Sequence, residues 1–303
     1  MPLLGTPLLG TPLLGAHMSV AGGLHKALIR AEKVGCQVIQ IFTKNNNQWK
    51  SKRLSEEQVV AFDERRKETG VIPVAVHDSY LINLASPRSD VEQQSFRALL
   101  DELERAERLG IPFLVIHPGA HLGEGESRGL SRISEGINRI HEQTVGYRVK
   151  ILLETTAGQG TNLGYRFEHL AEIIDKTVHR DRIGVCFDTC HAFAAGYDFR
   201  SLKTYRALFR TFDEIIGINR LMLFHINDSK KGLGSRVDRH EHIGAGTIGL
   251  EAFSRLLKDE RFINLPFLLE TPKGKNKNGV DLDKVNLNLL RRLKGKSYKH
   301  DRI

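Results

Sequence analysis

Six residues that can bind metal ions stand at the ends of six apolar runs, and their spacing along the chain is nearly regular. They lie 34 to 45 residues apart and are His77, His117, Glu154, Asp188, His225 and Glu270. Any one of them alone could be a buried histidine with a hydrogen-bond partner or a helix-capping carboxylate. Burying six ionisable groups around one pocket is costly unless they pair or bind metal ions. The pattern therefore predicts one shared metal site.

A glycine-rich stretch carries further candidate ligands. Its sequence is HINDSKKGLGSRVDRHEHIGAG, residues 225–246, and it includes Asp238 and His240. Side chains two positions apart in an extended segment point the same way, so these two can reach one ion. The glycines would let the stretch fold back over the site. His191, three residues after one of the six, is a ninth candidate, whereas we expect His242 to contact solvent or phosphate.

The set of five histidines and four carboxylates is too large for one ion. Zinc usually takes four nitrogen, oxygen or sulfur ligands, and three ions that share a carboxylate would use nine ligands. Paired metal ions hold the attacking and leaving oxygens of a phosphoryl displacement. The formal net charge of +9 fits a polyanionic substrate. These features predict hydrolysis of a phosphodiester in a polyanion.

The elements that must position these residues are eight short apolar runs separated by amphipathic stretches. The runs cover residues 13–19, 37–43, 72–78, 112–118, 150–156, 183–189, 221–227 and 266–272. Continuous apolar runs of this length favour parallel strands buried on both faces. Eight strands alternating with helices predict an α/β fold, a single (β/α)8 TIM barrel. Catalytic side chains in such barrels lie at the carboxyl ends of the strands, so we expect a trinuclear metal site at that face.

The stretches between the runs show helical periodicity. One apolar stripe comprises Leu99, Leu103, Ala106 and Leu109. Ser89 with Glu92, and Ser55 with Gln58, have the spacing of capping boxes at helix N-termini. Gly110 is typical of a helix end. We interpret the stripes as core faces rather than cofactor sites.

The N-terminal segment PLLGTPLLGTPLLGA repeats a five-residue unit three times. It has no basic start and is interrupted by proline and glycine, which makes a signal peptide a poor interpretation. We expect only the last copy to enter the fold, with residues 1–11 as a mobile extension and residues 12–303 as the barrel domain. No run approaches the roughly 18 apolar residues of a membrane span, so we expect no membrane partner.

The three cysteines are odd in number and sparse, which argues against a disulfide framework. A reducing cytoplasm fits this usage. We expect Cys186 and Cys190 to be small buried residues.

Six longer segments resemble the signature segments of a known family. They are HDSYLINLASP, IHPGAH, LLETTAGQGTNLG, GVCFDTCHAFAAGYD, HINDSKKGLGSRVDRHEHIGAG and LPFLLETP. In order and length they are similar to segments of the endonuclease IV family of apurinic/apyrimidinic endonucleases, from about Gly15 to Lys273. The resemblance implies a trinuclear-zinc TIM barrel, a DNA repair enzyme that cuts double-stranded DNA on the 5′ side of abasic sites. The products would be a 3′-hydroxyl and a 5′-deoxyribose phosphate.

The resemblance also implies a role for each candidate ligand. It assigns His77, His117 and Glu154 to a first Zn²⁺ ion, Glu154, Asp188, His225 and Glu270 to a second, and His191, Asp238 and His240 to a third. Glu154, as the shared carboxylate, and Glu270 would act as catalytic residues. We expect the enzyme to work as a monomer.

Recognition of damaged DNA must come from loops, because metal ions do not distinguish damaged from intact DNA. The segment FTKNNNQW, residues 42–49, offers Lys44 for a phosphate contact. It also offers Asn45, Gln48 and Trp49 for stacking or hydrogen bonding in an opened minor groove. For Trp49 the alternative is a loop residue packed on the barrel rim. Tyr80 resembles the family's DNA-inserting tyrosine.

Two other functions stay open on the sequence. Sugar isomerases and epimerases of related architecture also place His, Glu and Asp at strand ends, and would use one or two divalent ions on a small polyol. They need no third metal site, so Asp238 and His240 discriminate between the two hypotheses. A metal-stabilised DNA-binding protein without catalysis would keep the charge but need no open coordination position.

Overall fold

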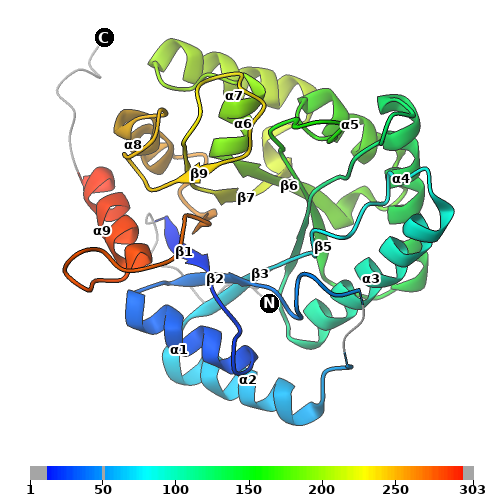
Figure 1. Cartoon of the computed structure of the whole chain (residues 1–303), viewed down its shortest axis with the longest axis horizontal. Helices are drawn as coiled ribbons and strands as arrows, with labels where there is room; N and C mark the ends of the chain where they lie inside the picture. Colours follow the sequence, from blue (N-terminus) through cyan, green and yellow to red (C-terminus); the bar gives the residue numbers. More distant parts are fainter. Residues whose placement is uncertain (1–11, 50–51, 296–303) are drawn as a thin grey trace.

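Eight parallel strands close into a barrel at the centre of the molecule (Figure 1). We describe a computed structural model that covers residues 12–49 and 52–295. The barrel strands are β1 (Leu13–His17), β2 (Val38–Ile41), β3 (Ile72–His77), β4 (Phe113–Ile116), β5 (Lys150–Glu154), β6 (Ile183–Asp188), β7 (Leu221–His225) and β10 (Pro266–Leu269). Each strand pairs with the next strand of the barrel in parallel register, and β10 closes the circle against β1. Every predicted strand run is present, and the predicted (β/α)8 barrel is confirmed.

Apolar side chains fill the barrel interior. One cluster of buried residues comes from the barrel strands alone and comprises Leu13, Val38, Val74, Ala75, Val115, Leu152, Cys186, Leu223 and Leu268. Cys186 is thus a small core residue, as predicted, and Cys190 is buried and free as well. The barrel is a packed core rather than a pore, so a ligand can enter only at its ends.

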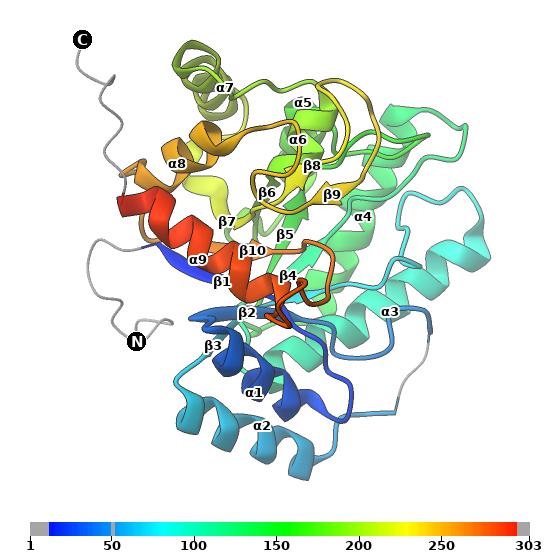
Figure 2. The ribbon, with the colours of Figure 1, turned by 60° about the vertical axis from the view of Figure 1, so that its left-hand side comes forward.

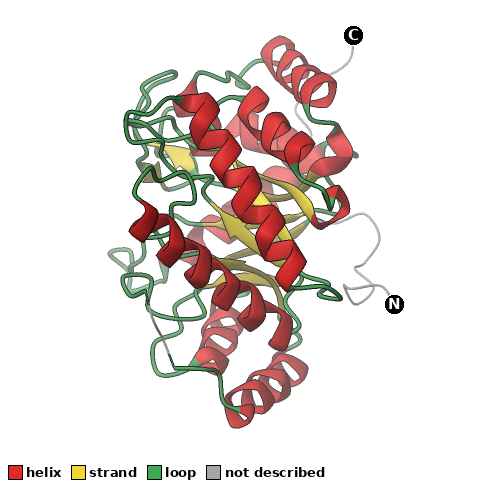
Figure 3. Ribbon diagram, turned by 90° about the vertical axis from the view of Figure 1, so that its right-hand side faces the viewer, coloured by secondary structure: helices red, strands yellow, loops and turns green. Residues whose placement is uncertain are grey.

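Helices surround the strands on the outside of the barrel (Figure 3). They are α1 (Leu24–Val34), α2 (Glu56–Thr69), α3 (Ser89–Arg108), α4 (Glu126–Gln143), α5 (Phe167–Lys176), α6 (Thr189–Ala195), α7 (Leu202–Ile215), α8 (Leu250–Lys258) and α9 (Leu282–Gly295). A larger apolar cluster lies between these helices and the strands and includes the predicted stripe of α3. No helix within the described ranges is both long and apolar enough to cross a membrane. The proposed extension over residues 1–11 lies outside the described residues.

Capping boxes are predicted at the N-termini of α2 and α3, and one of the two is present. Ser55 caps α2 in a complete capping box with Gln58, as predicted. The capping box predicted for Ser89 and Glu92 is wrong, because α3 begins one residue earlier than the pattern requires. The Arg88 carbonyl already accepts the backbone N–H of Glu92 at 2.9 Å, so Ser89 is itself helical and caps nothing.

The connection after β7 departs from the simple alternation of strand and helix. It contains a two-stranded antiparallel hairpin of β8 (Asp228–Ser229) and β9 (His240–Glu241). Figure 2 shows this segment, in yellow, above the ends of the barrel strands. The glycine-rich stretch predicted to fold back over the barrel therefore does so.

Candidate metal centre

The six residues predicted at strand ends meet at one end of the barrel. His77, Glu154, Asp188 and His225 are the last residues of β3, β5, β6 and β7. His117 follows β4 at its carboxyl end, and Glu270 follows β10 directly. Parallel strands in a closed barrel all point the same way, so their carboxyl ends bring these side chains together. Glu154, Asp188 and His225 are fully buried.

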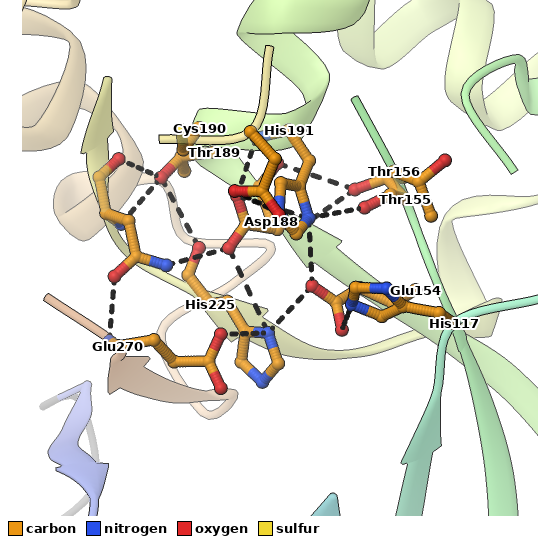
Figure 4. Close-up of polar contacts among 12 residues, drawn as sticks. His117, Glu154, Thr155, Thr156, Asp188, Thr189, Cys190, His191, His225 and Glu270 are labelled. Carbon is orange, nitrogen blue, oxygen red and sulfur yellow. Dashed lines mark hydrogen bonds and ion pairs between the residues drawn. The ribbon is translucent and has the colours of Figure 1, made fainter. Parts of the chain in front are cut away.

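The Glu154 carboxylate lies at the centre of the site (Figure 4). Its Oε2 lies 3.1 Å from His77 Nε2 and 3.3 Å from His117 Nε2. Its Oε1 lies 3.0 Å from His191 Nδ1 and 3.1 Å from His225 Nδ1. Each oxygen of this carboxylate therefore faces two imidazole rings.

A second group gathers around His225. Its Nδ1 lies 3.2 Å from Glu270 Oε2 and 3.9 Å from Asp188 Oδ2. Asp188 is also the N-cap of α6, and its Oδ1 accepts the backbone N–H of His191 at 2.7 Å. This cap fixes the first turn of α6, which carries His191 into the site.

A third group lies where the β8–β9 loop returns to the barrel. Asp238 Oδ1 lies 3.2 Å from His191 Nε2 and 3.5 Å from His240 Nε2. The two imidazole nitrogens lie only 3.3 Å from each other. Three ligand atoms that converge in this way fit a cation between them.

The resulting sets of neighbouring ligand atoms match the three predicted sets. His77, His117 and Glu154 form one set, Glu154, Asp188, His225 and Glu270 form another, and His191, Asp238 and His240 form the third, with all atoms of a set within 4.8 Å of one another. A further set of neighbouring ligand atoms comes from Asp188, Cys190 and His240. The Cys190 thiol donates a hydrogen bond to the Arg239 carbonyl oxygen at 3.6 Å, and burial raises its pKa to about 12.

The buried groups shift one another's pKa. Burial alone would lower the pKa of His77, but contact with Glu154 raises it to about 10. Burial opposes the charge on Glu154, yet His225 and His117 hold its pKa well below the usual value. The carboxylates thus require positive charge beside them, either from protons on the imidazoles or from metal ions. Imidazole nitrogen and carboxylate oxygen are a donor set that suits divalent ions such as zinc, so the residues fit metal binding.

The β8–β9 loop owes its position to Asp228. The carboxylate of this buried residue accepts four backbone N–H groups, those of Ser229, Gly244, Gly246 and Ile248, at 2.8 to 3.2 Å. Both ends of the loop are therefore held by one side chain. The loop between them carries Asp238 and His240 to the third ligand set.

A cleft of about 400 Å³ opens beside the ligands. It is lined by Tyr80, His117, Asp238, Arg239 and neighbouring residues. Tyr80 is 67% exposed, and its ring lies 6.2 Å from that of His77 and 6.4 Å from that of His117. Tyr80 thus lies at the mouth of the cleft with its aromatic ring exposed.

The residues predicted to contact DNA from the loop after β2 have different surroundings. Asn45 and Gln48 are exposed, whereas Trp49 is partly buried against the apolar core. Lys44 does not fit the phosphate contact that we expected. Its side chain is 1% exposed, and its Nζ lies 2.9 Å from Asp101 and 3.3 Å from Glu102, both on α3. The charge of Lys44 is therefore paired with these two carboxylates of the protein itself.

Sequence reasoning missed two polar residues of the site. Gln40 on β2 is fully buried and contacts both Glu270 and His225. His17, the last residue of β1, lies 3.4 Å from Glu270 Oε1. Both lie in predicted strand runs, so the rule applied to the other six strands would have found His17. Gln40 gave no such signal because an amide is not a typical ligand for zinc.

Comparisons with known proteins decide the family. A family model described as a xylose isomerase-like TIM barrel matches residues 28–293. A probable endonuclease 4 of Chloroflexus aggregans is 54% identical over 278 residues, which cover 92% of this chain and 96% of that protein. A probable endonuclease 4 of Geobacter sulfurreducens is also 54% identical, over 92% of this chain and 93% of its own length. The chain belongs to the endonuclease IV family of apurinic/apyrimidinic endonucleases.

Solved structures agree with membership of the endonuclease IV family. The crystal structure of endonuclease IV from Thermus thermophilus matches with a TM-score of 0.82 at 35% identity, covering 94% of this chain and all of that one. A D-tagatose 3-epimerase-like protein matches with a TM-score of 0.69 at 21% identity, covering 92% and 96%. The second match shows a shared fold alone. This chain and the epimerase-like protein thus share the barrel fold.

Proposed function

We propose that this chain hydrolyses the phosphodiester on the 5′ side of abasic sites in double-stranded DNA. Water would add to phosphorus while the bond from phosphorus to the 3′-oxygen breaks, and the proton lost by water would end on that oxygen. The products are a 3′-hydroxyl and a 5′-deoxyribose phosphate. We propose that the enzyme works as a monomer in the cytoplasm.

The observation that carries this proposal is the position of Glu154. Its two oxygens face separate sets of imidazoles, and a third set adjoins them through His191. Nine side chains in three adjacent sets are suited to hold three Zn²⁺ ions, with Glu154 shared by two of them. Bound zinc would supply Lewis acidity that activates water and stabilises negative charge on the phosphate.

The protein's own residues would bind and orient the substrate. The cleft beside Tyr80 and His117 leads to the ligands and would receive the sugar–phosphate backbone. Tyr80 is exposed and lies on a turn directly after β3, so it can enter the gap left by a missing base. Glu154 and Glu270 would act as catalytic residues by holding the reacting centre's metal ions.

Loops around the metal centre would hold the DNA. Asn45 and Gln48 remain available from the loop after β2, with Trp49 as their packed support. Lys230 is 64% exposed on the loop after β7, and Arg239 is exposed beside the cleft. These cations replace Lys44 in the proposed phosphate contacts.

A duplex with a single abasic site tests the function. Zinc-loaded protein should nick the damaged strand on the 5′ side and leave an end that a DNA polymerase can extend, and it should leave an undamaged duplex intact. Protein stripped with a chelator should lose activity and regain it with Zn²⁺. Binding without nicking by the zinc-loaded protein would favour the DNA-binding alternative, and epimerisation of a ketose without any nicking would favour the sugar enzyme.

A further inference from the structure

Gln40 joins two candidate ligands of the second metal set. Its Nε2 lies 2.7 Å from Glu270 Oε1, and its Oε1 lies 2.9 Å from His225 Nε2. Its Nε2 also lies 3.0 Å from His17 Nδ1. Gln40 is fully buried, so water does not compete for these contacts.

The partners determine which way the amide points. An ionised carboxylate can only accept hydrogen bonds, so the Gln40 NH₂ group must face Glu270. The amide oxygen then faces His225 Nε2 and can only accept from it. His225 must therefore carry its hydrogen on Nε2. The second hydrogen of the NH₂ group is donated to His17 Nδ1.

The consequence for His225 is a fixed tautomer. With the hydrogen on Nε2, Nδ1 of the neutral ring presents a lone pair. That lone pair faces Glu154 Oε1 at 3.1 Å and Glu270 Oε2 at 3.2 Å. Positive charge must therefore lie between Nδ1 and these oxygens, either as a proton on Nδ1 or as a metal ion, and a zinc ion held by both carboxylates would take the place of the proton.

The Gln40 amide also gives the two oxygens of the Glu270 carboxylate different partners. Oε1 is held by Gln40, whereas Oε2 is the oxygen nearest to His225. One side chain thus sets the ring orientation of a histidine and the rotation of a carboxylate. Hydrogen bonds of this kind to a metal ligand raise its affinity for the ion.

We propose that Gln40 is a positioning residue that makes His225 bind its metal ion through Nδ1 and Glu270 through Oε2. This inference rests on the proposed function insofar as the ligands hold zinc, and it goes beyond it by naming the residue that prepares two of them. A buried glutamine with a purely structural role would leave the histidine tautomer and the metal affinity unchanged when replaced.

The first test uses the zinc-loaded wild-type protein. Nitrogen NMR of ¹⁵N-histidine-labelled protein, with His225→Asn to assign the signal, reports which ring nitrogen carries the hydrogen. We expect Nε2–H for His225, with Nδ1 showing the shift of a metal-bound nitrogen. A hydrogen on Nδ1 would overturn the inference, and this measurement depends on no variant at position 40.

The second test replaces the amide. Gln40→Met keeps the length of the side chain but removes the hydrogen bonds, and competition with a chromogenic chelator should show one zinc ion bound roughly 10- to 100-fold more weakly. Gln37→Met, on the exposed residue just before β2, is the matched control and should bind zinc like the wild type. Unchanged affinity in Gln40→Met would refute the inference even if the protein nicks abasic DNA. Weaker binding in a protein that never nicks DNA would instead refute the proposed function alone.

Discussion

The Asp228 carboxylate occupies the space that a side chain at residue 246 would need. A Cβ added to Gly246 would lie 2.4 Å from Asp228 Oδ1 and 2.4 Å from the carbonyl oxygen of Ser229. Because Asp228 holds both ends of the loop that carries Asp238 and His240, the absence of a side chain at residue 246 is a condition for the third metal set. The position of two ligands thus depends on a glycine several residues away.

Gly246→Ala should therefore loosen the loop without unfolding the barrel. The new methyl group must displace Asp228, which releases backbone N–H groups at both ends of the loop. We expect the variant to bind about one zinc ion fewer per chain, measured by elemental analysis, with its circular dichroism unchanged. Gly232→Ala is the matched control, because an added Cβ there has no atom within 4 Å among the described residues. Full zinc content in Gly246→Ala would show that the loop does not depend on this clamp.

Removing single ligands should separate the three metal sets. His240→Ala leaves His191 and Asp238 as the remaining side chains of the third set, and two ligands should hold zinc weakly. We expect loss of about one zinc ion and at least a 10²-fold slower single-turnover nicking rate, which corresponds to about 3 kcal/mol in the barrier. Glu154→Gln should instead lower the occupancy of two ions, because Glu154 belongs to two sets. Near-normal zinc and turnover in His240→Ala would show that His240 is not a metal ligand and that nicking needs no ion at the third set.

Lys44 should matter for stability rather than for DNA binding. Replacing it with Met leaves Glu102 buried without its cation, and loss of one member of a buried pair costs roughly 3 kcal/mol. Chemical denaturation should show this loss. The salt dependence of DNA binding should stay as in the wild type, and a reduced dependence would restore Lys44 as a phosphate contact.

The fate of Lys44 shows which features the sequence could predict. Strand-end ligands follow from the periodicity of a repeated strand–helix unit, so His77 and the equivalent residues could be found from local patterns. The partners of Lys44 lie on α3, far along the chain, and no local pattern predicts that α3 packs against the loop after β2. Gln40 could not be predicted for a related reason. Its partners lie on β7 and after β10, and only the closed barrel brings them near Gln40.

His141 should make the stability depend on pH. It is fully buried on α4, and neither ring nitrogen has a hydrogen-bond partner among the described residues. Burial, aided by Arg182, lowers the pKa of His141 to about 4, below the value near 6.5 of an unfolded chain. Between these values the unfolded chain binds a proton that the folded protein does not, so stability falls as the pH falls through this window.

His141→Leu should remove this contribution. We expect the variant to be at least as stable as the wild type at pH 7, and its relative advantage to grow by about 2 kcal/mol at pH 5. Denaturation should be measured with a chelator present, so that loss of metal at low pH affects neither protein. His179→Leu removes an exposed histidine whose ring lies 6.0 Å from that of His141, and it should gain no such advantage. An advantage that does not change with pH would mean that the pKa of His141 is the same in the folded and the unfolded protein.

Exposed cations around the metal centre should set the salt dependence of binding to abasic DNA. Each phosphate neutralised by the protein releases counterions, so the log–log slope of affinity against salt changes by roughly −0.9 per contact. Lys230 and Lys231 are exposed on the loop after β7, and the backbone N–H of Lys230 donates to the carbonyl oxygen of Arg239, the residue between Asp238 and His240, at 2.9 Å. If both contact phosphates, replacing both with Ala should make the slope shallower by up to roughly 1.8 while the zinc content stays the same.

Fluorescence anisotropy with an uncleavable abasic duplex measures this slope. The Lys44→Met variant is the matched control, since it removes one positive charge from the interior rather than from the surface. A slope near zero for the wild-type protein would count against a DNA substrate. A slope unchanged in the double variant would move the phosphate contacts to other loops, because neither lysine would then release counterions on binding.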